Sequence, residues 1–177
     1  MAGSGADERA WIRGAQNGNA SDLEALFRHH WPRAYRAAYL VVHDTGAAED
    51  IAQEAFLAAV RHLHRFDRRR PFGPWLHRIV VNRSIDWARA RALRRETGDA
   101  ALSAVAAAET RGGAEARPLA EALLQLSPEH RAVIVLRHLL EYTPGEIGEL
   151  LSLPRGTVNS RLRRGLDHLA ELLEADR

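Results

Sequence analysis

An arginine-rich segment between two phenylalanines has the residue types that bind single-stranded nucleic acid. Arg68, Arg69 and Arg70 follow one another between Phe66 and Phe72. Guanidinium groups pair with phosphates, and aromatic rings stack on unpaired bases with a stabilisation of about 1–3 kcal/mol per base. The segment therefore predicts a contact with unpaired nucleic acid. The alternative is a solvated basic loop that Phe66 and Phe72 anchor in the hydrophobic core.

The helix expected over residues 73–94 extends this candidate nucleic-acid surface. Four polar residues, spaced four, four and three apart, share one stripe of the helix: Arg78, Asn82, Asp86 and Arg89. An Asn side chain offers both a donor and an acceptor, so Asn82 can read the edge of an exposed base. Arg83 is expected to hold a backbone phosphate. We expect Trp75 and Trp87 to lie mostly in the core.

Two helices expected over residues 144–151 and 154–174 have the pattern of a helix-turn-helix. Short polar residues at the start of the second helix, followed by arginines one turn later, suit the reading of base edges in the major groove. The residues expected to face bases are Asn159, Ser160, Arg163 and Arg164. Those expected to hold phosphates are Arg155, Thr157 and Arg161. The alternative is a plain helical hairpin with an arginine face.

A helix expected over residues 46–64 has one apolar face and one acidic face. The apolar face predicts core positions, namely Ile51, Ala52, Ala55, Phe56, Ala59, Val60 and Leu63. The opposite face carries Asp50, Gln53, Glu54 and Leu57, with Arg61 at its end. Acidic stripes are usually solvated, but a leucine among acids is typical of a surface that binds a basic protein partner.

These candidate residues are positioned by helices alone, since apolar residues recur with helical spacing and no alternating strand pattern is evident. The helices are expected near residues 6–17, 21–42, 46–64, 73–94, 118–126, 128–141, 144–151 and 154–174. Ser127 before Pro128, and Thr143 with Glu146 three residues later, mark two helix starts. The prediction is an all-α chain of two small helical domains, residues 15–95 and 118–174, joined by a flexible linker over 96–117.

The composition limits the function classes. The 177 residues contain no Cys and no Lys, and the net charge is +2 with a pI of about 9.6. Between Arg61 and Arg95 there are eleven arginines and two aspartates, which indicates an anionic partner for that part of the chain. No apolar run approaches the roughly 20 residues of a membrane span, so we expect a cytoplasmic protein.

No catalytic or metal-binding pattern emerges. The pairs His29-His30 and His62-x-His64 lack the spacing of four that places two ligands on one helix face, and no Cys accompanies them. We therefore expect no metal, no cofactor and no enzymatic activity.

The order of these motifs resembles the sigma-70 family of bacterial transcription initiation factors. The stretch from Glu49 to Phe56, followed by Arg65-Phe66 and the run from Phe72 to Asn82, resembles region 2. The residues 127–142 resemble region 4.1. Region 4.2 is matched by Thr157, Val158, Ser160, Arg161 and Arg164. Because only these two regions are present, the chain is similar to the extracytoplasmic-function (ECF) group.

The resemblance implies a role for each surface. The acidic face of helix 46–64 would bind the β′ coiled coil of RNA polymerase, and the β flap is a further expected contact. Residues 66–72 and helix 73–94 would bind the −10 element as a melted single strand with a flipped base, and the helix-turn-helix would bind the −35 duplex. An anti-sigma factor is a further partner that the family allows, and the location would be the nucleoid. Pro74 and Asn159 depart from the family pattern, which bears on the bases that are read.

Two other classes of protein fit parts of this pattern. A stand-alone helix-turn-helix regulator would bind duplex DNA without polymerase. A protein-interaction module would sequester a partner, and its function would not need Arg163 and Arg164.

Overall fold

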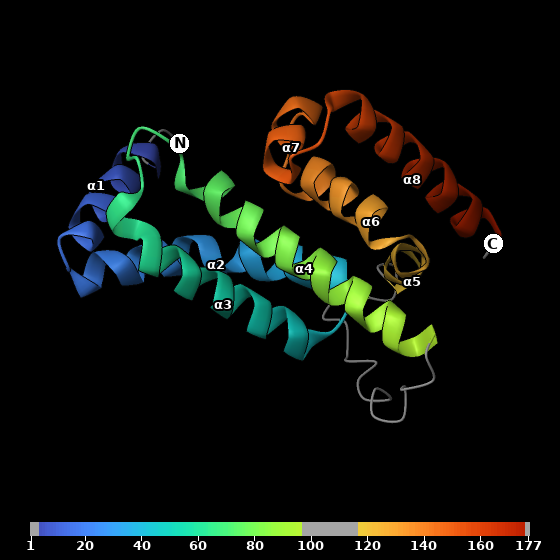
Figure 1. Ribbon diagram of the computed structural model, residues 1–177, viewed down its shortest axis with the longest axis horizontal. Coiled ribbons are helices and arrows are strands. Elements are labelled where there is room, and N and C mark those ends of the chain that lie inside the picture. Colours follow the sequence, from blue (N-terminus) through green and yellow to red (C-terminus); the bar gives the residue numbers. More distant parts are fainter. Residues whose placement is uncertain (1–3, 97–116, 176–177) are drawn as a thin grey trace.

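The computed structural model describes residues 4–96 and 117–175 of the chain (Figure 1). Every regular element within these residues is helical, which confirms the predicted all-α class. In chain order the elements are α1 (Ser4–Gln16), α2 (Ala20–Val42), α3 (Thr45–His62), η1 (Leu63–Arg65), α4 (Phe72–Glu96), α5 (Arg117–Gln125), α6 (Pro128–Ile134), η3 (Val135–Leu139), α7 (Pro144–Leu151) and α8 (Arg155–Ala175). Residues 97–116 of the predicted linker lie outside the described residues. None of the described helices has the length and hydropathy of a membrane span.

Short polar side chains begin four of these helices by accepting hydrogen bonds from backbone N–H groups that have no partner inside the helix. Asn19 caps α2 and Asp44 caps α3. Ser127 caps α6, followed by Pro128 in the first turn. Thr143 caps α7 in a reciprocal arrangement with Glu146. The last two caps confirm the helix starts predicted from the sequence.

The predicted helix 128–141 differs from the structure at its end. The α-helical hydrogen bonding stops at Ile134, and the chain continues as one π turn, η3. In this wider turn the Leu140 N–H donates to the Val135 carbonyl at 3.1 Å. Glu141 follows with a φ of 62°, a left-handed conformation that ends the helix. The chain can then reverse into α7.

Helices α1 to α4 form an N-terminal module (residues 4–96) around one hydrophobic core. Leu26, Phe56, Leu76 and Val80 are buried in this core. Ile12 of α1 is fully buried with them, so the module includes α1 as well as the predicted domain 15–95.

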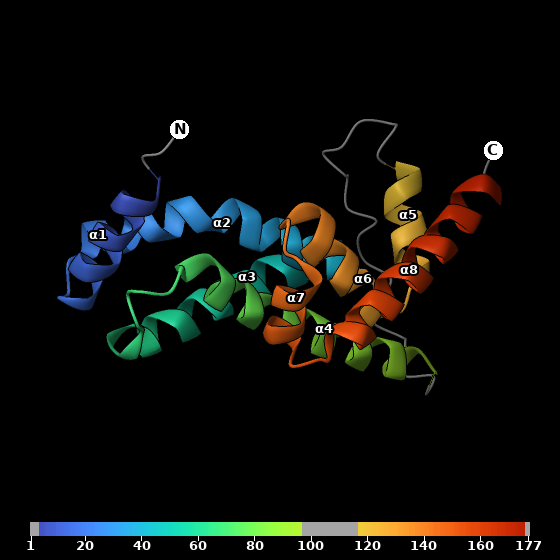
Figure 2. The same cartoon turned by 90° about the horizontal axis from the view of Figure 1, so that it is seen from above.

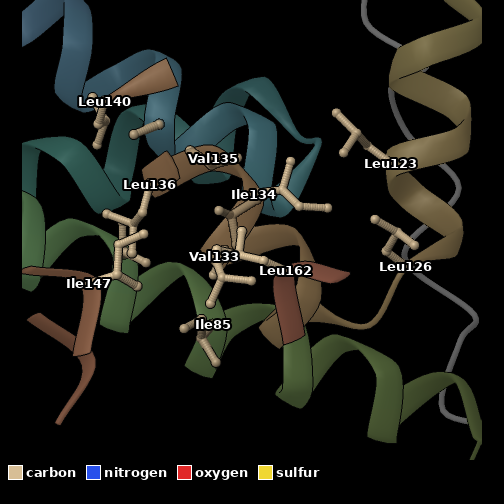
Figure 3. Close-up of a cluster of buried hydrophobic side chains, with 14 of the residues drawn as sticks. Ile85, Leu123, Leu126, Val133, Ile134, Val135, Leu136, Leu140, Ile147 and Leu162 are labelled. Atoms are coloured by element: carbon tan, nitrogen blue, oxygen red, sulfur yellow. The ribbon is translucent and has the colours of Figure 1, made fainter. Parts of the chain in front are cut away.

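A second hydrophobic core is shared between that module and the C-terminal module (residues 117–175). Val41 of α2 and Ile85 of α4 belong to the same buried cluster as Val133 and Leu162 of the C-terminal module. Figure 3 shows Ile85 close to Val133 and Leu162. Burying a side chain of this size stabilises a structure by about 1.5–3 kcal/mol. The two predicted domains therefore pack on each other.

Gly148 provides a test of the helix-turn-helix packing. A Cβ at Gly148 would lie 2.6 Å from the Leu153 carbonyl oxygen, so Gly148→Ala must displace the turn. We expect a loss of about 1–3 kcal/mol in the free energy of unfolding, measured by urea denaturation. The matched control is Gly156→Ala, where a Cβ meets nothing within 4 Å and stability should stay the same or rise slightly. Equal stability of the two variants would contradict the close approach.

Candidate nucleic-acid and polymerase interfaces

The residues predicted to read the major groove lie on the outer side of α8. Val158 and Leu162 are buried on the inner side of this helix. Asn159, Arg163, Arg164 and Arg155 are exposed, whereas Thr157, Ser160 and Arg161 are half-buried. Figure 2 shows α8 at the end of the molecule opposite α1. The exposed residues are free to approach base edges and phosphates without a rearrangement of the helix.

Hydrogen bonds fix both ends of α7, the helix that precedes the turn into α8. Thr143 N–H donates to the Glu146 carboxylate at 2.7 Å, and Glu146 N–H donates to the Thr143 hydroxyl at 3.4 Å. Ser152 adopts a left-handed conformation with a φ of 55° and donates its N–H to the Gly148 carbonyl. Both ends of α7 are therefore defined, which sets the direction in which α8 leaves the turn.

The polar stripe of α4 faces the C-terminal module. Near one end of the stripe, the Arg78 guanidinium donates to the Ser152 hydroxyl of the helix-turn-helix at 3.4 Å. At the other end, the Arg89 guanidinium donates to the Glu129 carboxylate of α6 at 2.6 Å. Asn82 lies between them on the same helix face and is half-buried. The predicted −10 contacts are thus partly occupied by the C-terminal module.

A histidine and a tyrosine join the same two modules. His77 Nδ1 of α4 lies 2.7 Å from the hydroxyl of Tyr142, the residue before the cap of α7. His77 is 5% exposed. Burial, with smaller effects from His30 and Arg33, lowers the pKa of His77 to about 4. The imidazole is therefore neutral at physiological pH.

Arg131 of α6 is buried between the modules. Its guanidinium donates to the Val41 carbonyl at the end of α2 and, at 3.1 Å, to the Leu126 carbonyl before α6. Burial lowers the pKa of Arg131 to about 10, so the side chain stays charged at neutral pH. The carbonyls at the end of α2 lack partners within that helix and carry its negative dipole end, which suits them to receive a cation.

The aromatic residues around the arginine loop form a small cluster. The ring centroid of Phe66 lies 4.7 Å from that of Trp75, and the Phe72 centroid lies 5.6 Å from the same ring. Phe72 is only 3% exposed, which supports the anchoring alternative for this residue; a base can reach its ring only if the loop rearranges. Phe66 is half-buried.

The three loop arginines are exposed, and one of them is paired within the loop. The Arg69 guanidinium donates to the Asp67 carboxylate through Nε, at 3.0 Å, and through Nη2, also at 3.0 Å. These contacts lower the pKa of Asp67 to about 2. Arg68 and Arg70 project into solvent beside this pair.

A cleft of about 830 Å³ separates the arginine loop from α7. Its lining includes Arg65, Arg70 and Arg78 from the N-terminal module. The lining from the C-terminal module includes Glu146 and Glu149. The cleft is therefore basic on one side and acidic on the other.

The acidic face of α3 is exposed as expected. Asp50, Gln53 and Glu54 are in solvent, and Leu57 is 51% exposed. Val60 was predicted to be in the core but is 40% exposed, because it lies at the edge of the buried face, one turn after Phe56. Next to Phe56 lies the half-exposed ring of Phe27, at a centroid distance of 4.9 Å.

An ion pair connects this acidic face to α4. The Glu54 carboxylate accepts a hydrogen bond from Arg83, so a predicted polymerase contact and a predicted phosphate contact pair with each other. Both side chains are largely exposed, so the pair contributes at most about 1 kcal/mol to stability. Either partner can be released at low cost.

The contacts that join the modules were not predicted from the sequence. Glu129 and Arg131 looked like ordinary polar positions at the start of a helix, and neither residue type nor spacing indicates a partner some 40 or 90 residues away. The place of Phe27 in an aromatic row on α2 could have been predicted from the sequence, because Phe27, Trp31 and Tyr35 recur at intervals of four.

The comparisons with known proteins agree with this geometry. The family model described as sigma-70 region 2 matches residues 26–94, and the model described as sigma-70 region 4 matches residues 116–169. Together they span both modules. The chain belongs to the sigma-70 family.

Curated relatives of this sigma-70 chain match over nearly its whole length. It is 32% identical to the ECF RNA polymerase sigma factor SigW of Bacillus subtilis, across 92% of this chain and 94% of that protein. It is 34% identical to the RNA polymerase sigma factor CarQ of Myxococcus xanthus, across 89% of this chain and 92% of that protein. The resemblance to the ECF group is confirmed, and with it a role in transcription initiation through RNA polymerase and promoter recognition.

Among solved structures, the fold is similar to CnrH in complex with the cytosolic domain of CnrY. The TM-score is 0.72 at 28% identity, covering 97% of this chain and 99% of that chain. The sigma factor RpoE in complex with the anti-sigma factor NepR, from Bartonella quintana, has the same fold with a TM-score of 0.72 at 23% identity, covering 89% of this chain and 100% of that chain.

The low pKa of His77 predicts acid-sensitive stability. Between pH 6.5 and about 4 the unfolded chain binds a proton at His77 that the native protein does not, so the free energy of unfolding falls as the pH falls through this window. The contribution of His77 should approach about 1.4 kcal/mol per pH unit. Urea denaturation at several pH values should therefore show a flatter profile for His77→Gln than for the wild type. The control, exposed His64→Gln, should keep the wild-type slope, and parallel profiles for all three proteins would contradict the assignment.

Proposed function

We propose that this sigma-70 chain directs RNA polymerase to promoters by binding a −35 duplex with α8 and a melted −10 strand with the arginine loop and α4. The observation that carries the proposal is the exposed Asn159 and Arg163 face of α8, on a fixed helix-turn-helix, in the same chain as the arginine-rich loop. Polymerase would perform the chemistry, so the chain needs no active site of its own.

The −35 duplex would bind α8 without a change in the conformation of the helix. Asn159, Ser160, Arg163 and Arg164 would face bases, while Arg155, Thr157 and Arg161 would hold phosphates. Arg pairs well with guanine and Asn with adenine through two hydrogen bonds each, at about 1–3 kcal/mol of discrimination per pair. Asn159 is therefore the residue we expect to set an adenine preference.

The −10 step uses residues that hold a melted strand. Arg68, Arg69 and Arg70 would follow the backbone, and Arg83 would hold a phosphate at the side of α4. Asn82 would hydrogen-bond an unstacked base, and the partly exposed ring of Phe66 would be available for stacking. This division assigns DNA melting to the N-terminal module.

Polymerase docking would use the exposed face of α3. Asp50, Glu54 and Gln53 offer acceptors to a basic surface, and Leu57 offers apolar area at its centre. The β′ coiled coil is the expected partner of this face, and the β flap is the expected partner of the C-terminal module. Both partners would place the chain in the cytoplasm at the nucleoid.

The packing of the modules adds a requirement for opening. Because Arg78 and Arg89 contact Ser152 and Glu129, a DNA strand would gain full access to the stripe of α4 only after the C-terminal module moves. Polymerase would separate the modules by binding each of them at its own site. A protein that holds the modules together would keep the factor inactive, and the charged cleft beside α7 gives an anti-sigma factor a place to do so.

Transcription in vitro tests the proposal. Core RNA polymerase with this protein, on a fragmented genomic library of the source organism, should produce transcripts that share two upstream motifs. Asn82→Ala should lower open-complex formation at these promoters by about tenfold, because it removes one hydrogen-bonded base contact between neutral groups, of about 1–3 kcal/mol. The same variant should leave −35 binding unchanged. Asn159→Ala should lower −35 binding instead.

The same experiment separates the other classes of protein. A stand-alone regulator would give a footprint on duplex DNA without polymerase and no new transcripts. Equal loss of both activities in both Asn variants would contradict the proposed division between the modules.

Removal of Glu129 tests the masking of the α4 stripe. Glu129→Ala removes the contact of Arg89 with the C-terminal module, so the isolated protein should bind a single-stranded −10 oligonucleotide more tightly. The gain should be at most about fivefold, because an exposed ion pair contributes at most about 1 kcal/mol. Fluorescence anisotropy measures the change. Exposed Glu174→Ala removes the same charge from the end of α8 and should have a much smaller effect. Equal gains would show that net charge alone is responsible.

A further inference from the structure

Three groups with metal-binding chemistry meet where α1 crosses α2 beside the first residue of α4. Glu8 of α1 and the adjacent His29 and His30 of α2 each offer a ligand atom, and these three atoms lie within 4.8 Å of one another. None of these residues belongs to the proposed polymerase or DNA surfaces. Histidine spacing within one helix gives no sign of this cluster, because Glu8 comes from a different helix than the two histidines.

One pair of these atoms, from Glu8 and His30, has the separation of metal ligands. Glu8 Oε2 lies 3.3 Å from His30 Nε2. Tetrahedral ligands with bonds of about 2.0–2.1 Å to Zn²⁺ lie about 3.3–3.4 Å apart. His30 is 6% exposed, and its Nε2 has no hydrogen-bond partner in this arrangement, because the carboxylate is near but not aligned with it. The buried His30 nitrogen thus faces the Glu8 oxygen at the separation of two metal ligands, without an aligned hydrogen bond between them.

The surroundings hold the ligands in place. The second carboxylate oxygen of Glu8, Oε1, accepts the Phe72 N–H at 3.0 Å, which orients the carboxylate and leaves Oε2 for an ion. The His29 ring lies 4.8 Å from the His30 ring and 5.7 Å from the Trp11 ring. His29 is exposed, which gives an ion a route from solvent and room for a water as the fourth ligand.

We propose that Glu8, His29 and His30 bind one divalent first-row transition ion, with Zn²⁺ as the best match to the chemistry. Two imidazoles and one carboxylate suit Zn²⁺, Co²⁺ or Ni²⁺, whereas Mg²⁺ and Ca²⁺ need more oxygen ligands than this site provides. The ion would fasten α1 to α2 directly beside the start of α4, where the arginine loop ends. It would therefore stabilise the N-terminal module without taking a ligand from its proposed DNA or polymerase surfaces.

Isothermal titration of the full chain with ZnCl₂ tests the site. The wild type should bind one Zn²⁺, and affinity should fall at least tenfold in both His29→Ala and Glu8→Gln. His29 is exposed, so its removal leaves the fold intact. Glu8→Gln keeps an oxygen that can accept the Phe72 N–H, and it therefore separates loss of a metal ligand from loss of a structural contact. Exposed His62→Ala is the matched control and should bind as the wild type does.

Cobalt provides a second readout. Co²⁺ bound by two imidazoles, a carboxylate and water should give the intense visible absorption of a tetrahedral complex, absent in His29→Ala and present in His62→Ala. Absence of Zn²⁺ binding by the wild type, or unchanged binding in His29→Ala and Glu8→Gln, overturns the proposal. Neither result bears on the transcription experiment, because the metal site and the promoter contacts share no residue.

Discussion

A single buried cation, Arg131, underlies the relation between the two modules. Its guanidinium is largely removed from water and makes no ion pair with a carboxylate of the described residues, so its hydrogen bonds go to backbone carbonyl oxygens. One of them, that of Val41, belongs to the N-terminal module, and another, that of Leu126, belongs to the C-terminal module. Separating the modules therefore returns the cation to water and exposes the end of α2 in the same event. The shared hydrophobic core and the contacts of α4 with α6 and α7 exist only while this arrangement holds.

The two proposed DNA surfaces therefore differ in how accessible they are to DNA. The face of α8 points into solvent, and a duplex can reach it in the closed arrangement. The stripe of α4 is contacted by the other module at Arg78 and at Arg89. In the proposed mechanism this difference sets an order of events, since the −35 duplex would find α8 open in the closed chain, whereas the −10 strand would find the stripe of α4 partly covered. Polymerase, which would engage both modules, would supply the free energy for the proposed change through differential binding to the open arrangement.

The sequence was sufficient for features that depend on local patterns. Helix periodicity, the Ser127 and Thr143 caps and the outward face of α8 follow from neighbouring residues, and they were predicted. The family resemblance added the order of the two regions. The module contacts could not be predicted, because Glu129 and Arg131 meet partners from distant segments and any exposed-looking polar residue could do the same. Val60 shows a related limit, since periodicity finds the buried face of a helix but does not fix how far its neighbours extend over the edge. Phe72 shows another, because an aromatic residue that could stack on a base is equally suited to hold a loop in the core.

The internal pairing of the arginines also affects how salt should act on DNA binding. Arg83, Arg89 and Arg69 are already paired with carboxylates of Glu54, Glu129 and Asp67. When such an arginine moves to a phosphate, the DNA releases a counterion, but the carboxylate left behind attracts a cation in its place. The net ion release is then smaller than the number of arginine contacts would suggest. Affinity for promoter DNA should therefore decline less steeply with ionic strength than the arginine content implies, and sequence-specific contacts should keep a larger share of the binding free energy in concentrated salt.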